Sequence, residues 1–210
     1  STVVACAPAD VELTEDMVLG AFTAAASQPV ENSADVIVPA SLVPPDAQAA
    51  MRERAEELAF LISLENGKAL TDARGEVAYA AEFFRWFAEE AVRNDGVIKH
   101  APATGARIIV QHNPAGIGVL VTPWNYPAAM GTRKIAPALA AGCSVVLKPA
   151  PDTPWTGTAL GHLAAEYTDI PAGIFNVVTS ADKSIGAALT RDPRVDMVSF
   201  TGSTATGRVV

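Results

Sequence analysis

The spacing of apolar residues predicts two amphipathic helices between residues 46 and 93. Over residues 46 to 66, Ala50, Leu58, Leu61 and Ile62 recur at helical intervals, and Asn66–Gly67 marks a helix end. Over residues 69 to 93 the apolar positions step by three or four, and they are Leu70, Ala73, Val77, Ala81, Phe84, Ala88 and Ala91. Asp95-Gly96 ends the second helix. We assign the aromatic residues from 83 to 87 to helix packing.

A different pattern, of short apolar runs rich in β-branched residues, begins at residue 107. The run Arg107–His112, which follows a polar loop, predicts a hairpin strand. The runs at 117–122, 144–148, 174–178 and 197–200 are apolar on both faces, and a helix-like segment follows each one. Strands alternating with helices form crossover units. The predicted fold class is therefore α/β, with a doubly wound, parallel, Rossmann-like sheet preceded by N-terminal helices.

The first 48 residues carry no comparable pattern. They contain an Ala-rich helix candidate at Glu15–Ala26 and a Pro-interrupted apolar stretch at 33–45 that we leave unassigned. Residues 49–210 have neither a linker nor a low-complexity segment. We therefore divide the chain into an N-terminal segment, 1–48, and one helix-preceded domain, 49–210.

Composition and charge exclude several classes of partner. Fifteen basic against 23 acidic residues give a net charge of -8, without the basic cluster that follows a phosphate backbone, so we expect no nucleic acid partner. No apolar run approaches the roughly 20 residues that span a bilayer, and the first residues are acidic where a signal peptide is basic. We expect a cytoplasmic protein without a membrane partner. Cys6, Cys143 and the histidines lack ligand spacing, so we expect no metal.

Parallel sheets bind ligands outside the carboxyl ends of their strands, so the residues after each run are the candidates for a site. They are Thr122–Tyr126, Lys148–Asp152, Thr179–Ser184 and Thr201–Thr204. In FTGSTATGR, Gly202 ends a strand and Ser203 opens a helix, whose free N–H groups suit a phosphate. Plain N-capping by Ser203 explains the same residues equally well. A P-loop fails because Arg208 stands where that motif needs Lys.

Two further residues at this edge have both a structural and a functional interpretation. Lys148 is either a solvated strand end or an ammonium that bonds a ribose or phosphate. Asn125 is either a turn residue between Pro123 and Pro127 or an amide donor for a developing oxyanion. Its position at the tip of a rigid strand favours the second interpretation, because such a side chain is better preorganised than one on a free loop.

Together these segments resemble the NAD(P)-dependent aldehyde dehydrogenase superfamily, and within it the succinate-semialdehyde dehydrogenases. The resemblance rests on TPWNYP, GTRKIAPALAAGCSVVLKPAPDTP and FTGSTATGR in this order, with 23 residues from Asn125 to Lys148 and 55 from Lys148 to Ser203. It extends back through RAEELAFLISLENGKAL and ARGEVAYAAEFFRWFAEEA. It implies oxidation of an aldehyde, with succinate semialdehyde as the expected substrate and NAD or NADP as the cofactor.

The resemblance also implies a role for each matching residue. Asn125 is the oxyanion-stabilising catalytic amide, and Arg133 pairs with the distal carboxylate of the substrate. The residues implied in cofactor binding are Thr122, Pro123, Trp124, Asn125, Lys148, Gly186, Phe200, Thr201, Gly202 and Ser203. The run 107–112 is implied in a homodimer or homotetramer, with its partner strand expected outside this chain.

Three departures from the family pattern limit these expectations. Pro151 and then Asp152 stand where many members have Glu, which leaves the choice between NAD and NADP open. Residues 28–45 lack the amphipathic helix usual in the family. The family's general-base Glu and nucleophilic Cys lie beyond the GSTxxG helix. Cys143 precedes a buried strand, and we interpret it as a structural thiol. We therefore expect an incomplete fold without the catalytic domain, inactive by itself; the alternative is a dinucleotide-binding module without catalysis.

Overall fold

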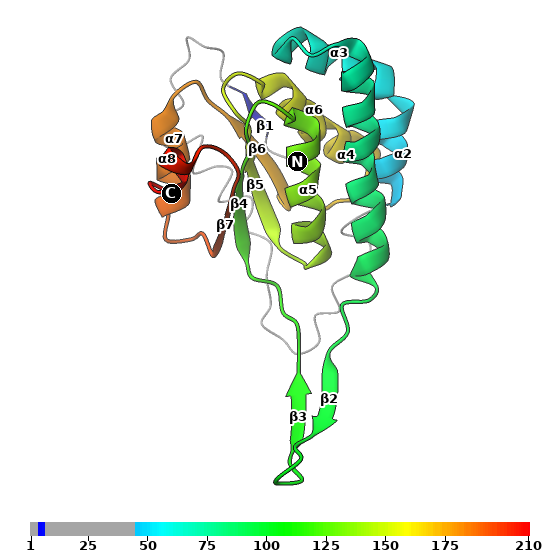
Figure 1. Cartoon of the computed structure of the whole chain (residues 1–210), viewed down its shortest axis with the longest axis vertical. Helices are drawn as coiled ribbons and strands as arrows, with labels where there is room; N and C mark the ends of the chain where they lie inside the picture. Colours follow the sequence, from blue (N-terminus) through cyan, green and yellow to red (C-terminus); the bar gives the residue numbers. More distant parts are fainter. Residues whose placement is uncertain (1–3, 7–44) are drawn as a thin grey trace.

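The computed structural model describes residues 4–6 and 45–210. The helix predicted at Glu15–Ala26 lies outside the described residues, as does the stretch from 33 to 44. Within the described part, a parallel sheet lies between two helical layers, and a long hairpin extends away from them (Figure 1).

The sheet has the strand order β1-β6-β5-β4-β7, and every neighbouring pair is parallel. The strands are β1 (Val4–Cys6), β4 (Ile117–Val121), β5 (Ser144–Lys148), β6 (Phe175–Thr179) and β7 (Met197–Phe200). The four apolar runs predicted as strands are confirmed. The short strand β1 was not predicted, because three residues in a segment without periodicity carry no strand signal.

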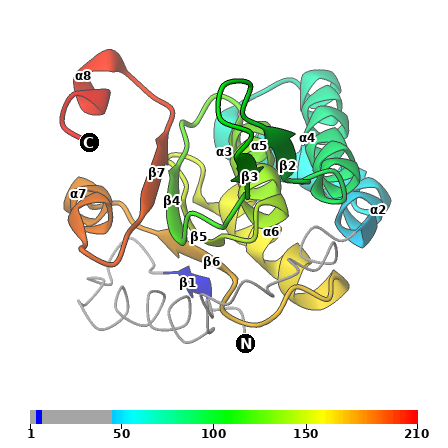
Figure 2. The ribbon, with the colours of Figure 1, turned by 90° about the horizontal axis from the view of Figure 1, so that it is seen from below.

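Helices cover both faces of the sheet, as a doubly wound arrangement requires (Figure 2). On one face, α5 (Pro127–Ala140) and α6 (Pro154–Tyr167) pack against Leu120, Leu147 and Phe175. On the other, Leu189 of α7 (Lys183–Arg191) packs with Val119, Val146 and Val178. The central strands β5 and β6 are buried along their whole length.

The N-terminal helices form a further layer outside α5 and α6. The single helix predicted over 46–66 is instead two helices, α2 (Pro45–Glu53) and α3 (Ala55–Asn66), which are separated at Arg54. The predicted stop is confirmed, since Gly67 adopts the left-handed conformation (φ 76°) and donates to Ser63 O. The second predicted helix is α4 (Leu70–Ala91), which buries Ala73, Val77, Ala81 and Phe84 as expected.

The extended hairpin corrects one prediction. Residues predicted as a polar loop contain β2 (Val97–His100), which pairs antiparallel with β3 (Arg107–Val110). The partner of the 107–112 run therefore lies in this chain, and the expectation that it lies outside was wrong. β2 mixes apolar residues with Lys99 and His100 and is exposed throughout, so its sequence lacks the apolar run by which buried strands are recognised.

Candidate functional site at the carboxyl edge of the sheet

Hydrogen bonds join the ends of three strands at the carboxyl edge. Thr122 N donates to Lys148 O (3.3 Å), and Thr201 N donates to Val121 O (3.1 Å). In the sheet register, Val121 lies between Lys148 on one side and Phe200 on the other. The candidate residues that the sequence predicted at the ends of β4, β5 and β7 therefore lie side by side.

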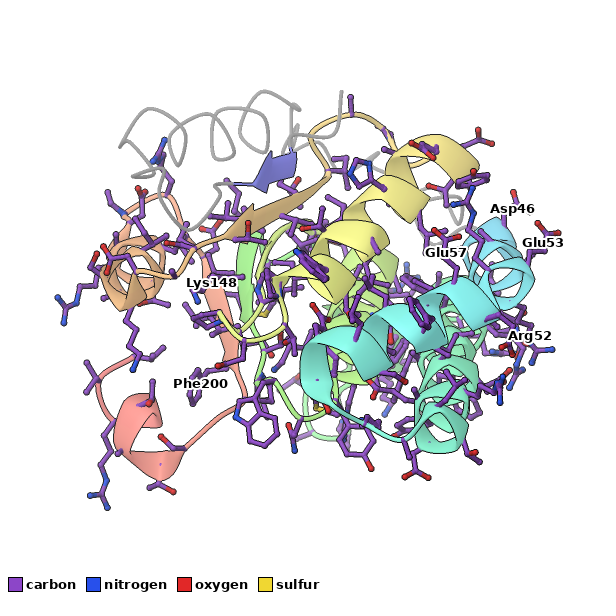
Figure 3. The ribbon with its side chains drawn as sticks, turned by 90° about the horizontal axis from the view of Figure 1, so that it is seen from above. Asp46, Arg52, Glu53, Glu57, Lys148 and Phe200 are labelled. Carbon is purple, nitrogen blue, oxygen red and sulfur yellow. The ribbon has the colours of Figure 1, made fainter. Side chains whose placement is uncertain are left out.

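Lys148 ends β5 with its side chain on the α7 face of the sheet (Figure 3). It is only 6% exposed, and its Nζ donates to Pro149 O at 3.2 Å. Burial lowers the pKa of this ammonium below its usual value. Gly186 of α7 lies over the lysine stem, because a Cβ there would be 3.6 Å from Lys148 Cε. Two of the candidate residues are thus neighbours in space.

Phe200 lies on the same face, next to the short helix α8 (Thr204–Gly207) (Figure 3). A Cβ on Gly202 would lie 2.5 Å from Phe200 Cζ, so a larger residue at this position would displace the ring. Ser203 is the N-cap of α8, and its Oγ accepts from Thr206 N at 3.2 Å. The capping interpretation of Ser203 is therefore confirmed, whereas its phosphate interpretation stays a prediction.

The loop from Thr122 to Tyr126 connects β4 to α5. Thr122 is buried, whereas Trp124, Asn125 and Tyr126 are exposed. The end of α3 and the α3–α4 connection hold the loop backbone, because Asn66 Nδ2 donates to Trp124 O (2.6 Å) and Lys68 Nζ donates to Asn125 O (2.9 Å). Among the residues that the structure describes, no hydrogen bond is made by the Asn125 side-chain amide.

Sequence reasoning missed Glu76, a buried carboxylate of α4 that is 2% exposed. Its Oε1 accepts from Ala128 N (2.9 Å) and Ala129 N (3.2 Å) at the start of α5, and its Oε2 pairs with Lys68 Nζ. The available signal was its position, since Glu76 lies on the helical face that Ala73, Val77 and Ala80 bury. An acidic residue on such a face needs a buried partner.

Arg133 lies on the other face of the sheet from Lys148, on α5, and is exposed. It lines an open hollow of about 640 Å³ between α5 and β7, whose other lining residues include Met130, Lys134, Ser199 and Thr201. Lys134 Nζ donates to Ser199 Oγ (2.8 Å), and burial together with the charge of Arg133 lowers the pKa of Lys134. The hollow is apolar with two cations, which suits a small anionic molecule with an apolar body.

The remaining predicted features concern residues outside this edge. Cys143 is free, 3% exposed, and immediately precedes β5, so it lies at the edge opposite Lys148 as predicted. Within residues 4–6 and 45–210, no cluster of His, Cys, Asp and Glu is arranged to hold a metal ion. No helix in that same part of the chain combines the length and apolarity needed to cross a membrane.

Comparison with known proteins gives consistent matches. The sequence matches the model of the aldehyde dehydrogenase family over residues 12–210. It is 52% identical over 156 residues to succinate-semialdehyde dehydrogenase of Paenarthrobacter nicotinovorans, which covers 74% of this chain and 34% of the relative. It is 50% identical over 158 residues to succinate-semialdehyde dehydrogenase (NADP(+)) GabD of Escherichia coli strain K12, which covers 75% of this chain and 33% of the relative.

A solved structure agrees with these sequence matches. The crystal structure of aldehyde dehydrogenase from Brucella melitensis biovar abortus 2308 superposes with a TM-score of 0.87 at 41% identity and covers 100% of this chain and 44% of that chain. The chain spans about a third of the length of the curated relatives that it matches.

Proposed function

This chain belongs to the aldehyde dehydrogenase family, and from that premise we propose that it supplies the cofactor-binding half of an enzyme that oxidises succinate semialdehyde to its acid. The observation that carries the proposal is the joining of the β4, β5 and β7 ends at one edge. There the Asn125 loop lies between a buried lysine on one face of the sheet and an arginine-lined hollow on the other.

The residues on the α7 face fit a dinucleotide. Lys148 makes one hydrogen bond within the described part of the chain, to Pro149 O, and an ammonium has three donors, so two remain for ribose hydroxyls or a 2′-phosphate. In this proposal Gly186 of α7, Phe200 at the end of β7 and the three residues between β7 and α8, which are Thr201, Gly202 and Ser203, line the dinucleotide, with Ser203 nearest its phosphates. Thr122, Pro123, Trp124 and Asn125 line the nicotinamide end. NAD or NADP, when bound, supplies the acceptor for hydride.

The choice between NAD and NADP depends on the residues near the ribose. Pro151 and Asp152 are both exposed, and no bond between Asp152 and Lys148 is formed. A carboxylate held against the ribose would disfavour a 2′-phosphate by like-charge repulsion. Without one, the Lys148 site accepts both cofactors in this proposal.

Asn125 acts on the aldehyde oxygen. As a nucleophile adds to the carbonyl carbon, this oxygen gains negative charge, and an amide N–H aimed at it stabilises that charge. Lys68 holds the backbone of Asn125 through its carbonyl oxygen, so its amide requires little reorganisation during the reaction. The exposed, unbonded state of the Asn125 amide within the described structure supports this role.

Arg133 is proposed to bind the distal carboxylate of the substrate. Its guanidinium forms no ion pair with another described residue, and it lines the apolar hollow beside Met130. A short aliphatic aldehyde with a terminal carboxylate matches this combination of apolar wall and unpaired cation.

The exposed hairpin is proposed to join subunits in a homodimer or homotetramer. Ile98 is 74% exposed and Ile109 is 63% exposed, and the two are opposite each other in the ladder. A lone two-stranded hairpin is marginal in water, and exposed apolar edges pair with other chains.

Calorimetric titration of the 210-residue protein with NAD and with NADP tests the cofactor proposal. We expect saturable binding that Lys148→Met weakens at least tenfold, because a charge-assisted hydrogen bond contributes about 1.5–3 kcal/mol. Lys99→Met removes an exposed hairpin lysine as the matched control and should bind like the wild type. If neither nucleotide binds, or if both variants bind equally, the assignment is wrong.

A further inference from the structure

Glu76 and Lys68 form a buried ion pair that faces the loop and not the solvent. The Glu76 side chain is fully buried and that of Lys68 is 13% exposed. The other ion pairs of α4, such as Arg74–Glu56, are largely exposed. A buried charge is stable only when hydrogen-bond or ionic partners surround it. The positions of those partners therefore indicate what the Glu76–Lys68 pair does.

All the remaining partners of the pair lie on the loop and the first turn of α5. Lys68 Nζ donates to Asn125 O at 2.9 Å and lies 3.9 Å from the ring centroid of Tyr126. Glu76 Oε1 accepts from the N–H groups of Ala128 and Ala129, which no residue of α5 itself can satisfy at the helix start. The pair therefore holds the backbone that follows the Asn125 side chain, from the Asn125 carbonyl to the first turn of α5.

We propose that Glu76 and Lys68 are positioning residues, which set the direction of the Asn125 amide. Lys68 fixes the Asn125 peptide, Glu76 fixes where α5 begins, and the charge of Glu76 keeps Lys68 in place. The inference rests on the proposed role of Asn125 as the oxyanion donor. An exposed loop residue would otherwise sample several orientations, and a donor displaced by about 1 Å costs on the order of 100-fold in rate.

A third side chain, that of Asn66 at the end of α3, holds the loop residue before Asn125. Asn66 Nδ2, two residues before Lys68, donates to Trp124 O at 2.6 Å. Asn66, Lys68 and Glu76 thus hold Trp124, Asn125 and the start of α5 from one side, while the side chain of Asn125 makes no bond to any described residue. Glu76 also stabilises the start of α5 by accepting from its free N–H groups, whereas the bonds of Lys68 and Asn66 go to the backbone of Asn125 and of the residue before it.

The first test is nuclear magnetic resonance of the isotope-labelled 210-residue protein in three variants. Lys68→Met removes the bond to Asn125 O, and Glu76→Gln keeps an acceptor for α5 but removes the charge that holds Lys68. Arg74→Met is the control, because it breaks an exposed ion pair on the same helix. We expect Lys68→Met and Glu76→Gln to shift the Asn125 side-chain amide resonances, and Arg74→Met to leave them unchanged.

The second test measures turnover of succinate semialdehyde in the whole enzyme of the proposed function, with Asn125→Ala beside the same variants. We expect Lys68→Met and Glu76→Gln to lower kcat about 10- to 100-fold with the dissociation constant for NADP unchanged, because Lys148 is untouched. Unchanged Asn125 resonances in both variants, or a loss of cofactor affinity equal to the loss of kcat, would overturn the positioning role. If Asn125→Ala itself keeps full kcat, the proposed function fails, and the resonances still decide whether the pair orients the amide.

Discussion

Replacing Gly157 by Ala separates two opposite effects of one added methyl group. Gly157 lies inside α6, buried against the residue that follows Lys148. A Cβ at this position would lie 2.7 Å from Cγ and 2.8 Å from Cβ of Pro149. The proline ring is tied to the backbone at both ends, so it cannot rotate away as a long side chain does. The matched site is Gly75 in α4, which is exposed and has nothing within 4 Å of its Cβ position.

The expected magnitudes follow from these two surroundings. Ala in place of Gly inside a helix stabilises by about 1 kcal/mol, and this gain applies at both sites. Overpacking of a filled core costs about 1–3 kcal/mol, and it applies only at Gly157. Gly75→Ala should therefore raise the free energy of unfolding by about 1 kcal/mol, whereas Gly157→Ala should change it by about 0 to -2 kcal/mol.

Urea unfolding followed by circular dichroism measures this difference, with thermal melts as a second measurement. For a chain of this size we expect each kcal/mol to move Tm by roughly 2–4 °C. Displacement of Pro149 also moves the carbonyl that accepts from Lys148 Nζ, so Gly157→Ala should weaken NADP binding whereas Gly75→Ala should not. Equal stabilisation by both variants, with equal cofactor affinity, would refute the argument from close packing.

Three further predictions concern charge, substrate and assembly. Burial lowers the pKa of Lys148, and a phosphate favours its protonated form, so NADP affinity should fall as pH rises through that lowered pKa. In titrations over a pH series, Lys148→Arg should remove this decline, because arginine stays protonated. Parallel curves of affinity against pH for the two proteins would contradict this. In the whole enzyme of the proposed function, Arg133→Met should lower kcat/KM for succinate semialdehyde by about 10- to 100-fold and change kcat/KM for butanal little, as spectrophotometric assays would show. Equal losses for the two substrates would exclude a carboxylate contact. Ile109→Lys should shift sedimenting species towards monomer without lowering Tm, and an unchanged distribution would exclude the hairpin from assembly.

The sequence predicted the elements whose patterns are local. Apolar runs located β4 to β7, helical spacing located α4, and Gly67 marked the end of α3 where the structure places it. Parallel strands bring their carboxyl ends to one edge, so the sequence also indicated which segments lie at the candidate site. The prediction failed where the local pattern was weak, as in β1 and β2, or where it passed over a single-residue break at Arg54.

Only the tertiary structure decided how the site is supported and divided. It showed that Lys148 and Arg133 lie on opposite faces of the sheet, and that Gly202 lies against the ring of Phe200. It also showed that Glu76 bonds residues more than 50 positions away at the start of α5. The periodicity of apolar residues shows which side of an element faces the interior, because each buried position favours an apolar residue independently of the others. The choice of which buried groups meet depends on how whole elements pack, and no local pattern in the chain contains that information.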